Sequence, residues 1–297
     1  AKVKIMVDID KFELKKSDMK LNYKICCDAK YFLEKLNFYF TSTKNYSNWI
    51  AFCSDLKIKY PIVQKKFYNL KKFVNSYVFI ETLSHNLNKK DIIVTDMGYS
   101  FTTTHQAFKN KEKQILLTNS GHAPMGWGLP AAIGASANGR NFTKVICLSG
   151  EGGFQMNIQE LATLMHNKIP IKIFIFNNGG YLTIKQTQQL GFKGRLMGST
   201  KSSGLSFPDY SKIAKSHKIK YFKIKNQAMM NSKIKKMINS KIPLICEVLM
   251  DPNEEQIPKA INRKNKDGTS IPTVFEDMYP FLNRDELKKV SFKNYEK

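Results

Sequence analysis

Glycines and a carboxylate occur together in residues 148–154, Leu-Ser-Gly-Glu-Gly-Gly-Phe. A strand-like run ends at Leu148 and a helical pattern follows, so the segment predicts a strand-to-helix turn. Glycines let backbone N–H groups approach a phosphate closely, and a helix N-terminus adds a partial positive charge. The carboxylate of Glu151 would repel a phosphate unless it binds a divalent cation that bridges to the phosphate oxygens. We therefore predict a metal-bridged phosphate site at this turn.

A second oxygen ligand for such a metal is expected at the end of a neighbouring strand. The pair Asn177-Asn178 directly follows the apolar run 171–176, and Asn178 lies 27 residues beyond Glu151. That separation accommodates one helix and one returning parallel strand, and ligands bind at the carboxyl ends of parallel strands. A Gly-Glu-Gly turn alone is often only a tight connection. Its combination with the asparagine pair is more specific.

The elements that position these residues follow from alternating apolar and amphipathic segments. Strand-like runs are 91–96, 145–148, 171–176, 221–222 and 243–250, and helical patterns cover 125–137, 158–166, a segment after Pro208, and 228–238. Continuous apolar strands between amphipathic helices predict an α/β fold, with a parallel sheet and helices on both of its faces.

The N-terminal quarter has a different character. Residues 2–10 form a strand-like run, 29–39 a helical pattern, and 41–75 an aromatic and lysine-rich connector. We place a domain boundary near residue 75, which separates residues 1–75 from a second domain of residues 76–297. From about residue 252 a polar tail is expected to wrap over that second domain.

The composition indicates which partners and which cellular compartment to expect. A formal charge of +24 would favour nucleic acid or an anionic membrane, but only four of the 48 basic residues are arginines, the preferred side chain for phosphate and base edges. We interpret the lysines as solvated surface and expect no nucleic acid. The apolar runs are shorter than the roughly 20 residues of a membrane helix, so we expect no membrane. Five cysteines without CxxC spacing indicate reduced thiols and a cytoplasmic protein.

The acidic residue between glycines, followed after one βα unit by paired asparagines, resembles the motif of thiamine-diphosphate-dependent enzymes. The resemblance is to the C-terminal part of the acetolactate synthase large subunit and covers nearly the whole chain. Residues 7–10 look like the final strand of the family's middle domain, residues 121–132 like the segment beneath the cofactor, and residues 251–254 like the exit of the last strand. The resemblance implies the thiamine-diphosphate-binding fold, preceded by a remnant of the middle domain.

Site residues are implied by position in this motif. Glu151 and Asn178 would ligate Mg²⁺ through their side chains, and Gly180 through its backbone carbonyl. The implied cofactor-binding residues are Gly98, Tyr99, Ser100, Met125, Gly150, Gly152, Gly153, Tyr181, Leu182 and Thr183, with Met125 as the apolar prop that keeps the cofactor bent. His122, Lys185 and Gln186 are further candidates for proton transfer or substrate contact.

Three positions depart from the family pattern. Glu151 stands where an aspartate is usual, Tyr99-Ser100 where a glutamine-histidine pair is common, and Thr187 where acetolactate synthases often have tryptophan.

The resemblance implies a carboligase or decarboxylase, a transferase or lyase, that acts on a 2-keto acid. Its activating glutamate is expected outside this chain, on a pyrimidine-binding domain of the same or another subunit, within a homodimer or tetramer. The catalytic residues are therefore unknown from this sequence. The alternative is a catalytically incomplete cofactor-binding subunit or fragment that needs such a partner domain. The sequence leaves open the donor and acceptor substrates and whether FAD is bound.

Overall fold

The chain forms two compact units. The computed structural model describes residues 2–16, 20–40, 45–137, 144–265 and 267–291. Unit 1 comprises residues 1–59 and unit 2 residues 60–297. The division therefore lies at residue 59, not near residue 75 as predicted from the sequence. The reason is packing, because Ile62, Val63 and Phe67 lie against the core of unit 2.

Unit 1 is a small α/β element. Strand β1 (Ile5–Asp8) pairs in parallel with β2 (Tyr23–Cys26), and helices α1 (Glu13–Lys16), α2 (Ala29–Tyr39) and α3 (Ser47–Lys59) complete it. The predicted strand at 2–10 and helix at 29–39 are confirmed. Strand β2 was not predicted, and helix α3 occupies part of the predicted connector. In the described part of this unit Leu14 alone is buried, so unit 1 has little core of its own.

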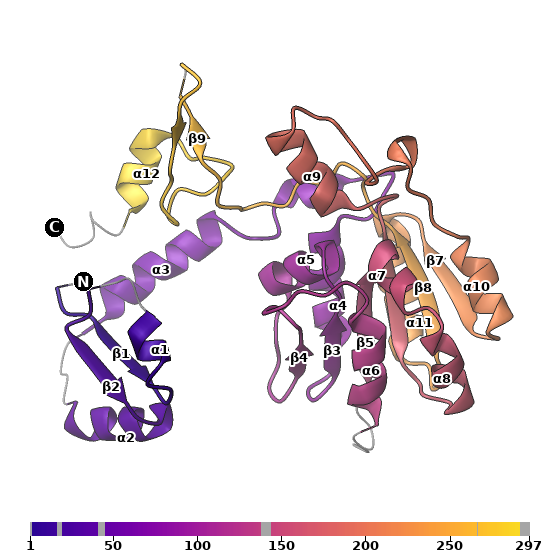
Figure 1. Cartoon of the computed structure of the whole chain (residues 1–297), viewed down its shortest axis with the longest axis horizontal. Coiled ribbons are helices and arrows are strands. Elements are labelled where there is room, and N and C mark those ends of the chain that lie inside the picture. The colour runs from indigo at the N-terminus through magenta and orange to yellow at the C-terminus, as the bar shows by residue number, and fades with distance from the viewer. Residues whose placement is uncertain (1, 17–19, 41–44, 138–143, 266, 292–297) are drawn as a thin grey trace. The chain divides into compact units, whose positions relative to one another are not determined.

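Unit 2 contains a six-stranded sheet with strand order β4-β3-β5-β6-β8-β7, in which all described pairs are parallel. Its strands are β3 (Ile92–Thr95), β4 (Ile115–Leu117), β5 (Val145–Gly150), β6 (Lys172–Asn177), β7 (Lys220–Ile224) and β8 (Leu244–Leu249). Figure 1 shows these strands with helices on both sides of the sheet. The predicted fold class is confirmed.

The helices of unit 2 connect these strands. They are α4 (Ser76–Asn86), α5 (Tyr99–Ala107), α6 (Gly128–Ser136), α7 (Glu151–Met156), α8 (Glu160–His166), α9 (Leu182–Gly191), α10 (Tyr210–Ser216) and α11 (Met230–Ile238), with 3-10 turns η1 (Lys65–Asn69), η2 (Lys201–Ser203) and η3 (Gln227–Met229). Within the described residues, no helix combines the length and the apolar character needed to cross a bilayer.

Two boundaries differ from the prediction. Strand β5 continues to Gly150, two residues beyond the predicted strand 145–148, and α7 begins directly at Glu151. Helix α6 begins at Gly128 instead of Met125, because Gly126 has φ +90° and cannot belong to a right-handed helix.

The core consists of two layers, one on each face of the sheet. Successive side chains of a strand point to opposite faces, as β6 illustrates. Phe174 and Phe176 pack with α4 and α11 in one cluster, whereas Ile173 and Ile175 pack with α6, α8 and α10 in the other. The strand ends near Glu151 and Asn178 are thereby fixed by burial on both faces.

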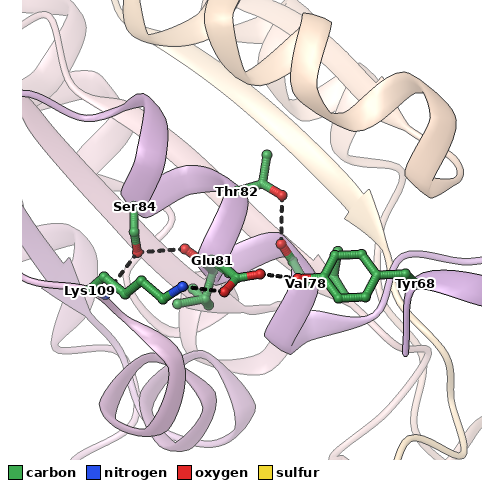
Figure 2. A network of polar contacts seen from close by, with 7 residues as sticks. Tyr68, Val78, Glu81, Thr82, Ser84 and Lys109 are labelled. Atoms are coloured by element: carbon green, nitrogen blue, oxygen red, sulfur yellow. Dashed lines mark hydrogen bonds and ion pairs between the residues drawn. The ribbon is translucent and has the colours of Figure 1, made fainter. Parts of the chain in front are cut away.

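A polar network attaches the start of unit 2 to helix α4 (Figure 2). The Glu81 carboxylate accepts a hydrogen bond from the Tyr68 hydroxyl of η1 and forms an ion pair with Lys109, just beyond α5. Burial alone would raise the pKa of Glu81, but the hydrogen bonds from Lys109 and Tyr68 outweigh it and lower that pKa. The backbone N–H of Lys109 also donates to Ser84 Oγ, at 3.2 Å. These contacts join η1, α4 and the end of α5.

After β8 the tail first runs along α4 and α5. The buried Glu254 carboxylate accepts from the backbone N–H of Ser76, at 3.0 Å, at the start of α4. Gln106 of α5 donates to the carbonyl of Pro258, at 2.9 Å. Farther on, strands β9 (Arg263–Lys264) and β10 (Ser270–Ile271) pair with each other, and α12 (Arg284–Val290) follows.

Candidate functional site

The carboxyl ends of β3, β5 and β6 frame a pocket of about 160 Å³. Its described lining contains every residue implied by the sequence resemblance except Ser100: Gly98, Tyr99, Met125, Gly150, Glu151, Gly152, Gly153, Asn178, Gly180, Tyr181, Leu182 and Thr183, together with Met97, Phe176 and Ile184. Ser100 is buried in the first turn of α5, where its hydroxyl donates to the carbonyls of Asp96 and Met97. The structure thus gathers residues up to 87 positions apart in sequence around one hollow.

Glu151 is the acid of this pocket. It is the first residue of α7, its side chain is buried, and its Oε1 accepts the backbone N–H of Gly179, at 2.7 Å. Burial raises the pKa of Glu151 to about 7, although the N–H groups of Gly179, Glu151 and Asn178 act in the opposite direction. A buried carboxylate with an elevated pKa gains from a nearby cation, because the cation favours its charged form.

The two asparagines at the end of β6 have different environments. Both polar atoms of the Asn177 amide form hydrogen bonds. Its Nδ2 donates to Glu247, and its Oδ1 accepts from the backbone N–H of Gly179, at 3.1 Å. In contrast, Oδ1 of Asn178 is buried and has no hydrogen-bond partner among the described residues. An unpaired buried oxygen costs about 1–3 kcal/mol, so this atom is expected to have a ligand.

The residues present fit a magnesium ion. A carboxylate, an amide oxygen and a backbone carbonyl are the hard oxygen ligands that Mg²⁺ prefers. Among the described residues no cluster of three or more histidine, cysteine, aspartate or glutamate side chains could hold a metal. The donor set must therefore combine Glu151 with neutral oxygens, and the unpaired Asn178 Oδ1 supplies one. Gly180, whose carbonyl is the third expected donor, is fixed by an antiparallel bridge to Thr200.

The glycines after Glu151 are required by close neighbours. A Cβ on Gly152 would lie 2.0 Å from Cε1 of Tyr181 and 3.0 Å from Cε of Met125. A Cβ on Gly153 would lie 2.6 Å from Oδ2 of Asp96, and one on Gly150 would meet nothing within 4 Å. Gly150 therefore borders open space, whereas Gly152 and Gly153 make room for protein side chains.

Asp96 was missed as a site residue by sequence reasoning. Its buried carboxylate accepts the N–H groups of Met97 (2.7 Å), Gly126 (3.0 Å) and Gly128 (3.3 Å), and the hydroxyl of Ser149 (2.9 Å). Burial raises the pKa of Asp96 despite these four donors. Asp96 thus ties the end of β3 to the end of β5 and to the turn before α6. The feature of the sequence that could have indicated Asp96 is its position as a carboxylate directly after an apolar strand.

Tyr99 is held by the tail instead of pointing freely at a ligand. Its hydroxyl donates to the carbonyl of Glu254, at 2.5 Å, and accepts from Gln186 of α9, at 2.8 Å. Lys185 donates to the carbonyl of Pro252, at 2.9 Å. Gln186 and Lys185 therefore dock α9 on the tail in this structure. His122 is exposed and lies outside the described pocket lining.

A second, larger cavity of about 750 Å³ lies next to the first. It shares Asn178, Gly180 and Leu182 with the smaller pocket. The segment 178–182, which carries two of the three expected metal ligands, therefore borders both hollows.

Comparison with known proteins identifies similar sequences for most of the chain. Residues 96–248 match the family model described as thiamine pyrophosphate enzyme, C-terminal TPP binding domain. A probable acetolactate synthase large subunit of Methanococcus aeolicus is 33% identical over 84% of this chain and 43% of its own length. A probable acetolactate synthase large subunit of Methanocaldococcus jannaschii is 33% identical over 96% of this chain and 48% of its own length. The chloroplastic acetolactate synthase 2 of Nicotiana tabacum is 29% identical over 86% and 39%. The chain spans less than half the length of these relatives.

Proposed function

Because the chain belongs to the thiamine pyrophosphate enzyme family, through its C-terminal TPP-binding domain, we propose that it serves a carboligase or decarboxylase that acts on a 2-keto acid, as acetolactate synthases do. When bound, thiamine diphosphate supplies the carbanion chemistry of such a reaction. This chain's residues supply the binding, orientation and electrostatics.

One observation carries the proposal. The unpaired Asn178 Oδ1 and the buried Glu151 carboxylate line the same pocket, and the N–H of Gly179 already links the two loops through Glu151. The Asn178 amide oxygen and the Glu151 carboxylate are thus available to bind a cation where the family's diphosphate is expected. We propose that Glu151, Asn178 and the Gly180 carbonyl hold Mg²⁺, and that the N–H groups near Gly150 face the diphosphate.

The remaining walls would orient the organic part of the cofactor. Met125 lines the pocket beside Gly152. Its flexible apolar side chain can support a bent ligand without competing for hydrogen bonds. Tyr181, Leu182 and Thr183 at the start of α9 also line the pocket. Tyr99 would contribute its ring, because its hydroxyl is already bonded to the tail.

A specific observation favours the alternative that this chain does not complete the reaction by itself. Among the described pocket residues Glu151 is the one carboxylate, and it is assigned to the metal. The acid that activates the cofactor would then come from a pyrimidine-binding domain, in the same polypeptide or in another subunit of a homodimer or tetramer.

The five free cysteines accord with a cytoplasmic location.

The experiment has two stages. Calorimetry of thiamine diphosphate binding in Mg²⁺ tests the cofactor assignment, and absence of binding would refute the proposed function. Carbon dioxide release from pyruvate and other 2-keto acids is then measured for the purified chain, with and without an added pyrimidine-binding domain. We expect activity only with the added domain, because loss of an acid–base group costs about 10²–10⁴ in rate. Robust decarboxylation by the chain alone would refute the alternative and place the activating acid within it.

A further inference from the structure

A buried carboxylate lies behind the proposed metal loop, one strand away from it. Glu247 belongs to β8, which pairs with β6, and 4% of its surface is exposed. Its carboxylate accepts hydrogen bonds from Asn177 Nδ2 and from the Tyr221 hydroxyl, and Lys223 Nζ lies 3.1 Å from Oε2. Glu247 lines neither of the two cavities beside the loop.

This carboxylate decides which way the Asn177 amide faces. An ionised carboxylate only accepts hydrogen bonds, so the Asn177 nitrogen must point toward Glu247 and its oxygen toward the Gly179 N–H. The Gly179 N–H is shared between Asn177 Oδ1, at 3.1 Å, and Glu151 Oε1, at 2.7 Å. Gly179 has φ +75°, so the chain turns sharply there and returns Gly180 to the pocket.

We propose that Glu247 is a positioning residue for the metal site, which sets the turn 177–180 through Asn177 and so directs the Asn178 oxygen into the pocket. The proposal rests on the proposed function, because it assumes a metal at Glu151 and Asn178. Outer-shell partners of this kind orient the ligands of a metal, and their loss typically costs about 10–100-fold in affinity.

The substitution Glu247→Gln tests the charge with little change in shape. Tyr221 and Lys223 are both donors and would claim the single remaining oxygen of the glutamine. Its amide nitrogen would then face Asn177 Nδ2, and the Asn177 amide would turn over. A turned amide presents its N–H₂ group to the Gly179 N–H, which opens the turn.

Tyr221→Phe is the matched control. It removes another hydrogen bond to the same carboxylate but leaves the carboxylate and its contact with Asn177 in place. If Glu247 served only to join β7 to β8, the two variants would behave alike. Asn177→Ala cuts the same link from its other end.

The measurement is the apparent affinity for Mg²⁺, from calorimetric titrations of the chain with thiamine diphosphate at a series of Mg²⁺ concentrations, with the melting temperature of the ligand-free chain taken in parallel. We expect Glu247→Gln and Asn177→Ala each to weaken Mg²⁺ binding about tenfold, the double variant to weaken it no further, and Tyr221→Phe to bind as the wild type does. Wild-type affinity in Glu247→Gln, or additive losses in the double variant, would overturn the proposal. If Glu247→Gln does not fold, unchanged affinity in Asn177→Ala overturns it equally. Absence of metal-dependent cofactor binding in the wild type would instead refute the proposed function.

Discussion

Replacing Asp96 by asparagine tests whether one carboxylate holds the three loops of the cofactor pocket together. The two backbone N–H donors of Met97 and Gly126 share Oδ1, while the Gly128 N–H and the Ser149 hydroxyl share Oδ2. An asparagine keeps the volume and one oxygen but brings an N–H₂ group. In either orientation that group faces at least one backbone N–H.

The less costly orientation places the amide nitrogen at the Oδ2 position. The Ser149 hydroxyl can rotate there and accept, so the Gly128 N–H is the donor left unpaired in a buried site. A lost hydrogen bond to a charged group together with an unsatisfied donor costs about 2 kcal/mol. For a domain of this size that lowers the melting temperature by about 4–8 °C. Because the displaced loops also carry pocket residues, thiamine diphosphate affinity should fall about tenfold, as for an outer-shell partner.

Asp91→Asn is a matched control at the opposite end of β3. Asp91 is also buried, and its carboxylate accepts the N–H groups of Asn88 (2.8 Å) and Lys144 (3.3 Å) far from the pocket. Thermal unfolding and calorimetric titration with thiamine diphosphate and Mg²⁺ are carried out on both variants. We expect both to lose stability and only Asp96→Asn to lose cofactor affinity. Equal cofactor affinity in the two variants would refute the argument that Asp96 shapes the site.

Three further outcomes are expected. Thiamine diphosphate should bind only with a divalent metal, because the diphosphate and the pocket carboxylate are both anionic, and equal affinity in a chelator would exclude the metal site. In the same calorimetric assay Asn178→Ala should weaken binding by more than the roughly tenfold expected for Asn177→Ala, since only the Asn178 oxygen is unpaired; equal losses would mean that the ligand is misassigned. Burial raises the pKa of Glu254 to about 7 from its ordinary 4.5, so the folded state binds its proton more tightly than the unfolded state does. The free energy of unfolding should therefore fall by up to about 3 kcal/mol as the pH rises from about 4.5 through 7. Urea titrations of Glu254→Gln should show a weaker dependence of this free energy on pH. An unchanged dependence would mean that other groups cause it.

The sheet and the proximity of Glu151 to Asn178 were predictable because their patterns are local. Buried parallel strands read as continuous apolar runs. Strands β3 and β8 lie within the runs identified in the sequence, and β5 and β6 end two residues and one residue beyond theirs. Glu151 and Asn178 stand directly after β5 and β6, and neighbouring parallel strands bring their carboxyl ends to one edge. Burial of the strands therefore sufficed to place these two residues in one pocket.

The contacts of Asp96 were not predictable, because its partners are distant in sequence. Its bonds reach Gly126, Gly128 and Ser149, which lie 30, 32 and 53 residues away. Helix α5 was missed for a different reason: three consecutive threonines, 102–104, have low helix propensity. Packing overrides that propensity, since Thr103 and Thr104 are fully buried. Glu247 did leave a sign in the sequence, because a carboxylate inside an apolar strand must find buried partners.

Three buried carboxylates follow one another across the carboxyl edge of the sheet. Asp96 follows β3, Glu151 follows β5, and Glu247 lies in β8 beside β6. Each accepts hydrogen bonds from the next loop or strand, so together they fix the loops that form the pocket. Their charges also add, and Glu247 contributes to the elevated pKa of Glu151. A diphosphate would meet this negative edge unfavourably, whereas a divalent cation would be attracted to it and could then bind the phosphate. The carboxylates that shape the pocket would thus also make its affinity for the cofactor depend on the metal.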